Sequence, residues 1–243
     1  MAVDSAQELY LELLKKTILY EIWIEHETGA IPENRRQGLD WPAIAHSMIG
    51  RLRMNNLHDC MKSVIADNIE GDFIETGVWR GGACIFMRGF LKAYGITDRR
   101  VWVADSFEGL PAPDVANYPV DEGAIFHTVD FLKVSLQEVA RNFYKYDLLD
   151  EQVRFLKGWF KDTLPTAPIE KLAIARLDGD MYSSTMQSLT SLYPKLSIGG
   201  YIIIDDYSIG YCSAAVHDFR AQHGIIEPIV PIDITGVYWR KMK

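Results

Sequence analysis

Two acidic motifs in this sequence each follow a short apolar run. Asp178-Gly179-Asp180 stands after the first run, and Asp205-Asp206 stands after the second. Both runs fit buried strands, and in an open parallel sheet the carboxyl ends of the strands meet at the ligand crevice. Carboxylates that converge there repel one another unless a cation lies between them, and hard divalent cations prefer such oxygen ligands. One motif alone would fit a helix N-cap equally well, but the two together predict a cation site.

A second group of candidate residues surrounds a glycine loop. Glu75-x-Gly77-x-x-x-Gly81-Gly82 follows a predicted strand and begins a predicted helix, so backbone amides there can approach a ligand. The spacing departs from the dinucleotide fingerprint G-x-G-x-x-G, and tight strand-to-helix turns use glycine equally often for structural reasons. Asp105, thirty positions after Glu75, ends the next predicted strand. An acid at that place commonly holds a ribose diol, which favours a nucleoside-containing cofactor.

The carboxylate of Glu75 discriminates between possible cofactors. It stands where a pyrophosphate would lie, so it would repel a diphosphate and would suit an ammonium or sulfonium group. This favours S-adenosylmethionine over NAD. The sequence has no Tyr-x-x-x-Lys pair of a short-chain dehydrogenase and no G-K-[ST] phosphate loop. An NAD-binding oxidoreductase or ligand-binding module remains the alternative from a different class.

Alternating strands and helices must position these residues. Strands are predicted at 73–77, 101–105, 153–158, 172–177 and 201–204, with a terminal hairpin from 225–232 and 236–241. Helices are predicted at 5–25, with Ser5 as N-cap, and at 41–69, 83–94, 135–149, 185–196 and 214–223, with Gly199-Gly200 as a turn. This order predicts βαβ units, an α/β fold and a mostly parallel sheet.

The chain is expected to form one domain over residues 1–243. Residues 1–70 would be a helical N-terminal extension and lid, and residues 71–243 a Rossmann-like core. The stretch 109–127 is long and rich in Pro, Asp and Gly, which is typical of a lid or binding loop.

Composition excludes several classes of function. The hydrophobic fraction of 48% is ordinary for a globular protein, and the net charge of −8 argues against a nucleic-acid partner. No apolar run approaches the roughly 20 residues that span a bilayer, and the segment Met1–Ser5 lacks the basic start of a signal peptide. Cys60, Cys84 and Cys212 are far apart and fit reduced thiols. We expect a cytoplasmic protein without membrane or nucleic-acid partners.

Several uncommon strings along nearly the whole chain resemble the macrocin O-methyltransferase (TylF) family. These are metal-dependent and S-adenosylmethionine-dependent sugar O-methyltransferases of macrolide and aminocoumarin biosynthesis. The matching strings occur in one order: Met48-Ile49-Gly50, Asn56-Leu57, Phe73 to Gly82, Ala104 to Pro111, Lys157 to Pro165, Leu177 to Tyr182, Gly199 to Tyr201, Asp205 to Tyr207, and Gly236 to Trp239.

The resemblance implies a class I methyltransferase sheet of seven strands, the last one antiparallel. It implies Mg²⁺ held by Asp178, Asp205 and Asp206, with Asp180 as the general base, although some relatives are thought to use a histidine. It also implies a homo-oligomer, a dimer or larger.

The residues assigned to S-adenosylmethionine follow from the same strings. They are Met48, Glu75, Thr76, Gly77, Arg80, Gly81, Gly82, Asp105, Ser106, Phe107, Gly158, Trp159, Phe160 and Asp178. The three aromatic members could face an adenine or belong to the core. Tyr182 and Tyr207 are candidates for the acceptor pocket, or equally for packing behind it.

The expected activity is therefore Mg²⁺-dependent methylation of a sugar hydroxyl on a glycosylated, antibiotic-type natural product. A catechol-type O-methyltransferase acting on an aromatic diol is the alternative within the same chemistry, because it uses a similar metal scheme.

Overall fold

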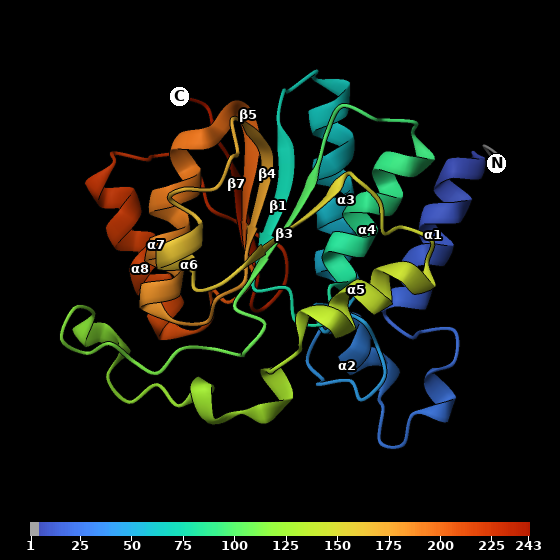
Figure 1. The fold of residues 1–243 in the computed structure, drawn as a ribbon, viewed down its shortest axis with the longest axis horizontal. Helices are drawn as coiled ribbons and strands as arrows, with labels where there is room; N and C mark the ends of the chain where they lie inside the picture. Colours follow the sequence, from blue (N-terminus) through green and yellow to red (C-terminus); the bar gives the residue numbers. More distant parts are fainter. Residues whose placement is uncertain (1–4) are drawn as a thin grey trace.

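The computed structural model describes residues 5–243, and residues 1–4, most of the segment weighed above as a signal-peptide start, lie outside that range. A seven-stranded sheet in the order β3-β2-β1-β4-β5-β7-β6 forms its centre (Figure 1). The strands are β1 (Asp72–Thr76), β2 (Val101–Asp105), β3 (Val153–Lys157), β4 (Leu172–Leu177), β5 (Leu196–Ile204), β6 (Val230–Pro231) and β7 (Val237–Arg240). Strands β1 to β5 pair in parallel, and β7 is antiparallel to both β5 and β6. The predicted seven-stranded, mostly parallel sheet is confirmed.

Helices cover both faces of this sheet (Figure 1). They are α1 (Ala6–Ile18), α2 (Pro32–Gln37), α3 (Gly50–Ala66), α4 (Gly82–Ala93), α5 (Leu136–Lys145), α6 (Phe160–Thr163), α7 (Tyr182–Leu192) and α8 (Gly210–Gln222). Figure 1 shows α3, α4 and α5 on one side and α6, α7 and α8 on the other. Successive strand residues enter opposite layers: Phe73 packs in the core beneath α3 and α4, and Ile74 in the core beneath α7 and α8. Burial on both faces explains why the central strands are almost wholly apolar. Within residues 5–243, no helix combines the length and apolarity needed to cross a bilayer.

The chain direction across the sheet reverses between β1 and β4, which are neighbours in the sheet but far apart in sequence. In open α/β sheets a ligand crevice forms outside the carboxyl ends of the strands at such a point. Gly77 directly follows β1 and has φ of +81°, and a Cβ there would overlap the carbonyl oxygen of Asp178. The two strand ends therefore come this close only because residue 77 is glycine.

The N-terminal region departs from the prediction. Ser5 caps α1 as expected, since its Oγ accepts the N–H of Glu8 at 3.3 Å, but the helix ends at Ile18 rather than near residue 25. The predicted helix at 41–69 begins only at Gly50. The preceding residues 38–49, called the 38–49 segment below, are irregular because their backbone groups bond to distant elements. The N–H of His46 donates to the carbonyl of Ile18, and its carbonyl accepts from Gly82.

The C-terminal half differs in smaller ways. Gly199-Gly200, predicted as a turn, lies inside β5, where a register shift against β4 and a φ of +88° at Gly199 accommodate a bulge. The helix predicted from residue 185 begins at Tyr182. The terminal hairpin is present, with shorter strands than predicted.

The stretch predicted as a lid or binding loop is irregular, as its composition indicated. Residues 109–132, called the 109–132 loop, contain only three single turns of 3₁₀ helix, at Pro119–Asp121, Phe126–Thr128 and Asp130–Leu132. Figure 1 shows this green loop and the blue N-terminal connections gathered at the same lower end of the molecule.

Candidate functional site

A cavity of about 810 Å³ lies at the carboxyl edge of the sheet, lined from the strand ends, the 38–49 segment and the 109–132 loop. Eleven of the predicted site residues line it: Met48, Glu75, Gly77, Asp105, Ser106, Trp159, Phe160, Asp178, Asp180, Asp205 and Asp206. The other predicted residues do not: Thr76, Arg80, Gly81, Gly82, Phe107, Gly158, Tyr182 and Tyr207. A volume of this size is typical of small-molecule and cofactor sites.

The three predicted metal ligands converge at one wall of this cavity. Asp178, Asp205 and Asp206 each offer a carboxylate oxygen, and these oxygens lie within 4.8 Å of one another. The sheet hydrogen bonds continue into the acids: the N–H of Asp178 donates to Thr76 and that of Asp205 to Leu177, both at 2.9 Å. Burial, followed by mutual repulsion of the carboxylates, raises the pKa of Asp178 and Asp206 well above the usual range. A buried acid cluster of this kind fits a hard divalent cation.

Asp180 lies beside the cluster in an uncommon backbone conformation. Its φ is +55°, and its N–H donates to Oδ2 of Asp206 at 3.0 Å, which fixes the turn between β4 and α7. Burial, and then the charges of Asp178 and Asp205, raise the pKa of Asp180 to about 7. A carboxyl group with that pKa can accept a proton near neutral pH.

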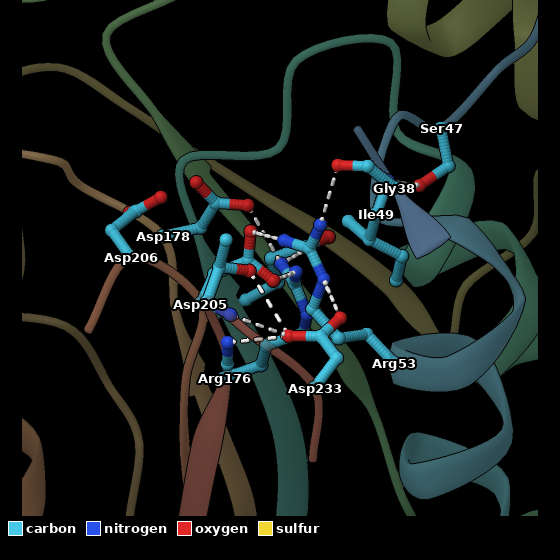
Figure 2. A network of polar contacts seen from close by, with 12 residues as sticks. Gly38, Ser47, Ile49, Arg53, Arg176, Asp178, Asp205, Asp206 and Asp233 are labelled. Atoms are coloured by element: carbon cyan, nitrogen blue, oxygen red, sulfur yellow. Dashed lines mark hydrogen bonds and ion pairs between the residues drawn. The ribbon is translucent and has the colours of Figure 1, made fainter. Parts of the chain in front are cut away.

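Arg176, which the sequence analysis did not single out, holds the cluster from behind (Figure 2). This fully buried side chain uses Nη1 to donate to Glu75 and to Oδ2 of Asp178, the latter at 2.9 Å, and Nη2 to donate to Oδ1 of Asp205. The signal that could have found it is an arginine inside an otherwise apolar strand, because a buried charge must be paired.

Glu75 lines the cavity, but both of its oxygens already have protein partners. Oε1 accepts from Arg176, and Oε2 accepts from the thiol of Cys84 at 3.1 Å. Burial raises the pKa of Glu75. The structure thus uses this carboxylate to neutralise Arg176, and its role opposite a sulfonium stays a prediction.

Asp105 also combines a cavity position with a structural task. Its Oδ2 accepts the N–H of Val78 at 2.8 Å, and its Oδ1 accepts the N–H of Phe107 at 2.6 Å. These bonds join the glycine loop to the loop after β2. Oδ1 also accepts from Oγ of Ser106 at 3.4 Å, so one acceptor position remains on Oδ2, and the assignment of Asp105 to a ribose diol stays a prediction.

The glycines at the start of α4 serve protein packing, which was one of the two interpretations left open. Gly81 has φ of +85°, and a Cβ there would lie 2.7 Å from Val139 of α5. A Cβ on Gly82 would overlap the carbonyl of His46, which accepts the N–H of Gly82 at 2.9 Å. Arg80 likewise holds the 38–49 segment, since its Nη1 donates to the carbonyl of Ala45 at 2.9 Å.

Aromatic side chains join the two irregular stretches over the cavity. Trp41 of the 38–49 segment stacks on Phe131 of the 109–132 loop, with ring centroids 5.4 Å apart and planes 11° apart. Phe131 also packs against Trp79, whose Nε1 donates to the carbonyl of Phe131 at 3.1 Å. Trp41 and Phe131 lie in irregular chain, where no periodic pattern could have predicted their contact.

Asp121 anchors the 109–132 loop to α7 and is a second residue that the sequence analysis missed. Its fully buried carboxylate accepts the N–H groups of Tyr182 at 2.8 Å and Ser183 at 3.0 Å. These are orphan donors of the first turn of α7, whose own N-cap residue Met181 supplies no side-chain acceptor. The loop therefore supplies the cap that the helix lacks.

Tyr182 and Tyr207 do not line the cavity in this structure, and their assignment to the acceptor pocket stays a prediction. The hydroxyl of Tyr182 donates to Oδ2 of Asp218 at 3.0 Å, and that of Tyr207 lies 2.9 Å from Nε2 of His217. Both partners belong to α8. The contacts that hold the two hydroxyl groups are therefore with α8.

Comparisons with known proteins identify the family to which this chain belongs. The family model for macrocin O-methyltransferases (TylF) matches residues 28–241. Mycinamicin III 3''-O-methyltransferase of Micromonospora griseorubida is 53% identical to this chain over 253 residues, which cover 99% of each protein. The 8-demethyl-8-(2,3-dimethoxy-alpha-L-rhamnosyl)-tetracenomycin-C 4'-O-methyltransferase of Streptomyces olivaceus is 51% identical over 98% of this chain and 94% of the relative.

The solved structure of the O-methyltransferase NovP superposes with a TM-score of 0.94 at 50% identity, covering 98% of this chain and 100% of that one. With a family match over most of the chain and relatives of such similarity, the resemblance stated from the sequence motifs is confirmed. The chain belongs to the macrocin O-methyltransferase (TylF) family and is an O-methyltransferase.

Proposed function

We propose that this O-methyltransferase moves the methyl group of S-adenosylmethionine to a sugar hydroxyl of a glycosylated natural product, with Mg²⁺ as its metal ion. The observation that carries the proposal is the position of Asp180 beside Asp178, Asp205 and Asp206 in one cavity wall. A relative that is 51% identical is named for methylating a tetracenomycin that bears a rhamnosyl group, which supports a sugar acceptor.

Asp178, Asp205 and Asp206 would hold Mg²⁺, and the raised pKa values of Asp178 and Asp206 support this assignment. Acids with raised pKa values hold protons more readily, so cation binding at the cluster is expected to displace protons. Mg²⁺ would supply polarisation of an alcohol oxygen. S-adenosylmethionine would supply the electrophilic methyl group.

The side chains of the protein would bind and orient the two substrates and would deprotonate the acceptor hydroxyl. Asp180 would accept the hydroxyl proton of the acceptor as the new C–O bond forms and the C–S bond of the sulfonium breaks. Asp105 and Ser106 would hold the nucleoside, and the stacked pair Trp41 and Phe131 would keep water from the reacting groups. Much of the rate would come from holding the two substrates in line.

The test is a methyl-transfer assay on a panel of deoxysugar glycosides and catechols, read by mass spectrometry. We expect transfer to glycosides that is lost with EDTA, restored with Mg²⁺ and absent in Asp178→Asn. Transfer to catechols alone would favour the aromatic-diol alternative. Full activity in EDTA would refute the role of the metal.

A further inference from the structure

Arg53 joins the acid cluster to two other parts of the molecule (Figure 2). It lies in the first turn of α3, and its side chain is buried. Nη1 donates to Oδ2 of Asp205, Nε lies 3.0 Å from Oδ2 of Asp233, and Nη2 donates to the carbonyl of Gly38 at 3.0 Å. One guanidinium thus connects the end of β5, the turn between β6 and β7, and the 38–49 segment.

The surroundings of Arg53 are shaped to hold this side chain. Gly38 has φ of +65°, and a Cβ there would overlap Nη2 of Arg53. A Cβ on Gly236 would lie only 2.9 Å from Cδ of Arg53. Asp233 is itself fixed, because its Oδ1 accepts the N–H groups of Thr235 at 2.9 Å and Gly236 at 2.7 Å. The guanidinium therefore lies in a rigid slot between two glycines.

The arrangement determines how Asp205 is oriented. Arg53 binds one oxygen of this carboxylate and Arg176 binds the other, so the carboxylate cannot rotate without losing a charged hydrogen bond. One acceptor position on each oxygen remains for a ligand. Groups that hydrogen-bond a metal-ligating carboxylate commonly determine its orientation and the affinity of the site.

The bond from Arg53 to Gly38 extends this control to the wall of the cavity. Ser47, Met48 and Ile49 of the 38–49 segment line the cavity in which the methyl donor is proposed to bind. Figure 2 shows Ser47 and Ile49 above Arg53, on the same side as Gly38.

We propose that Arg53 is a positioning residue that couples the cation site to the 38–49 segment. It orients Asp205 toward the cation and anchors, through Gly38, the wall of the cofactor cavity. This inference rests on the proposed function, because it requires a divalent cation at the acid cluster. Coupling between two sites is reciprocal, so cation binding should order the segment and an ordered segment should strengthen cation binding.

The experiment compares the full-length protein with Arg53→Lys, which keeps one positive charge but lacks the planar fork that reaches Asp205, Asp233 and Gly38 at once. Mg²⁺ binding is measured by calorimetry, and the order of the 38–49 segment by amide hydrogen exchange with and without Mg²⁺. We expect Arg53→Lys to weaken Mg²⁺ binding by about 10–100-fold. We also expect Mg²⁺ to slow exchange in residues 38–49 of the unmodified protein and to have no such effect in the variant.

Arg51→Lys is the matched control. Arg51 lies two residues away on the same helix, but it pairs with Glu12 and Glu21 on the side of α1. The Arg51→Lys variant should bind Mg²⁺ with the same affinity as the unmodified protein. Asp233→Asn is a second variant, which leaves Arg53 and Asp205 intact. It should also weaken Mg²⁺ binding, by a smaller factor, and it tests the inference if Arg53→Lys folds poorly.

Two results would overturn the inference in distinguishable ways. If the unmodified protein binds Mg²⁺ and Arg53→Lys binds it equally well, the coupling is wrong and the proposed function stands. If the unmodified protein binds no Mg²⁺, both the inference and the metal-dependent part of the proposed function fail together.

Discussion

At the scale of single residues, the site holds more negative charge than its protein partners neutralise. Arg53 and Arg176 pair with Asp205, and Arg176 also reaches Asp178. Within the described chain, neither Asp180 nor Asp206 forms an ion pair, and the pKa of each is raised. Such groups must hold protons or face a cation, which is the physical basis of the proposed metal site.

Asp180→Asn should lower methyl transfer and, at the same time, raise the stability of the metal-free protein. Burial and the neighbouring acids raise the pKa of Asp180 on folding from 3.8 to about 7. The stability that protonated Asp180 contributes is therefore fully present below pH 3.8 and is lost as the pH rises through 7. In EDTA the variant should gain in melting temperature over the unmodified protein at pH 8, and gain less at pH 5. Methyl transfer should fall by roughly 10²–10⁴-fold.

Thermal melts at the two pH values check the first part of this prediction, and single-turnover assays check the second. A melting-temperature difference that is the same at pH 5 and pH 8 would show that Asp180 does not titrate with a raised pKa.

Arg176→Met should be strongly destabilising, because it leaves Glu75, Asp178 and Asp205 without their shared guanidinium. Removing one partner of a buried ion pair costs about 3–5 kcal/mol. Urea denaturation of Arg176→Met measures this cost. Adding Glu75→Gln should recover part of it, since one buried carboxylate is removed, and failure to recover any would mean that Glu75 is not ionised beside Arg176.

At the scale of elements, the strands were predictable and the irregular segments were not. The runs before Asp105, Asp178 and Asp205 are apolar because parallel strands are buried on both faces, and that composition is local information. The acids at the strand ends followed from the same pattern. The start of α3 could not be predicted in this way, because the backbone of residues 38–49 is held by Ile18 and Gly82, which are distant in the sequence.

The same distinction between local pattern and distant contacts explains which site residues could be predicted from the sequence. Asp121 bonds to Tyr182, and Arg53 bonds to Asp205, each more than fifty positions away, so no motif in their own neighbourhood indicates these roles. Neighbouring residues of a helix point in directions about 100° apart, so the sequence motif alone does not decide that the hydroxyl of Tyr182 contacts α8. Ser183 and Gln187, one and five positions further on, line the cavity from α7 instead.

Asp121→Ala tests the attachment of the 109–132 loop to α7. It removes the acceptor for the N–H groups of Tyr182 and Ser183, and loss of a helix cap costs about 0.5–2 kcal/mol. Amide exchange in residues 109–132 should accelerate, and KM for the acceptor should rise while binding of S-adenosylhomocysteine is retained. Asp130→Ala is the matched control, because Asp130 is an exposed acid of the same loop that pairs with exposed Lys133. Equal exchange in the two variants would contradict the role of Asp121.

At the scale of the whole molecule, one cavity is assembled from segments spread between Gly38 and Thr235. The sheet brings the strand ends together, and the 38–49 segment and the 109–132 loop close over them through Trp41 and Phe131. A ligand in this cavity would therefore contact the ends of several strands and both irregular segments, and its binding energy should appear as stability of the chain.

S-adenosylhomocysteine should accordingly raise the melting temperature of the intact protein. A ligand at 100 times its Kd stabilises the folded state by about 2.7 kcal/mol, which corresponds to roughly 5–10 °C for a chain of this length. Mg²⁺ should add to the shift, because at the proposed site it would neutralise Asp178 and Asp206 in the same cavity. NAD at the same concentration is the control and should shift the melting temperature little, since the cavity wall is acidic where a pyrophosphate would lie. Stabilisation by NAD without stabilisation by S-adenosylhomocysteine would exclude S-adenosylmethionine as the methyl donor proposed here.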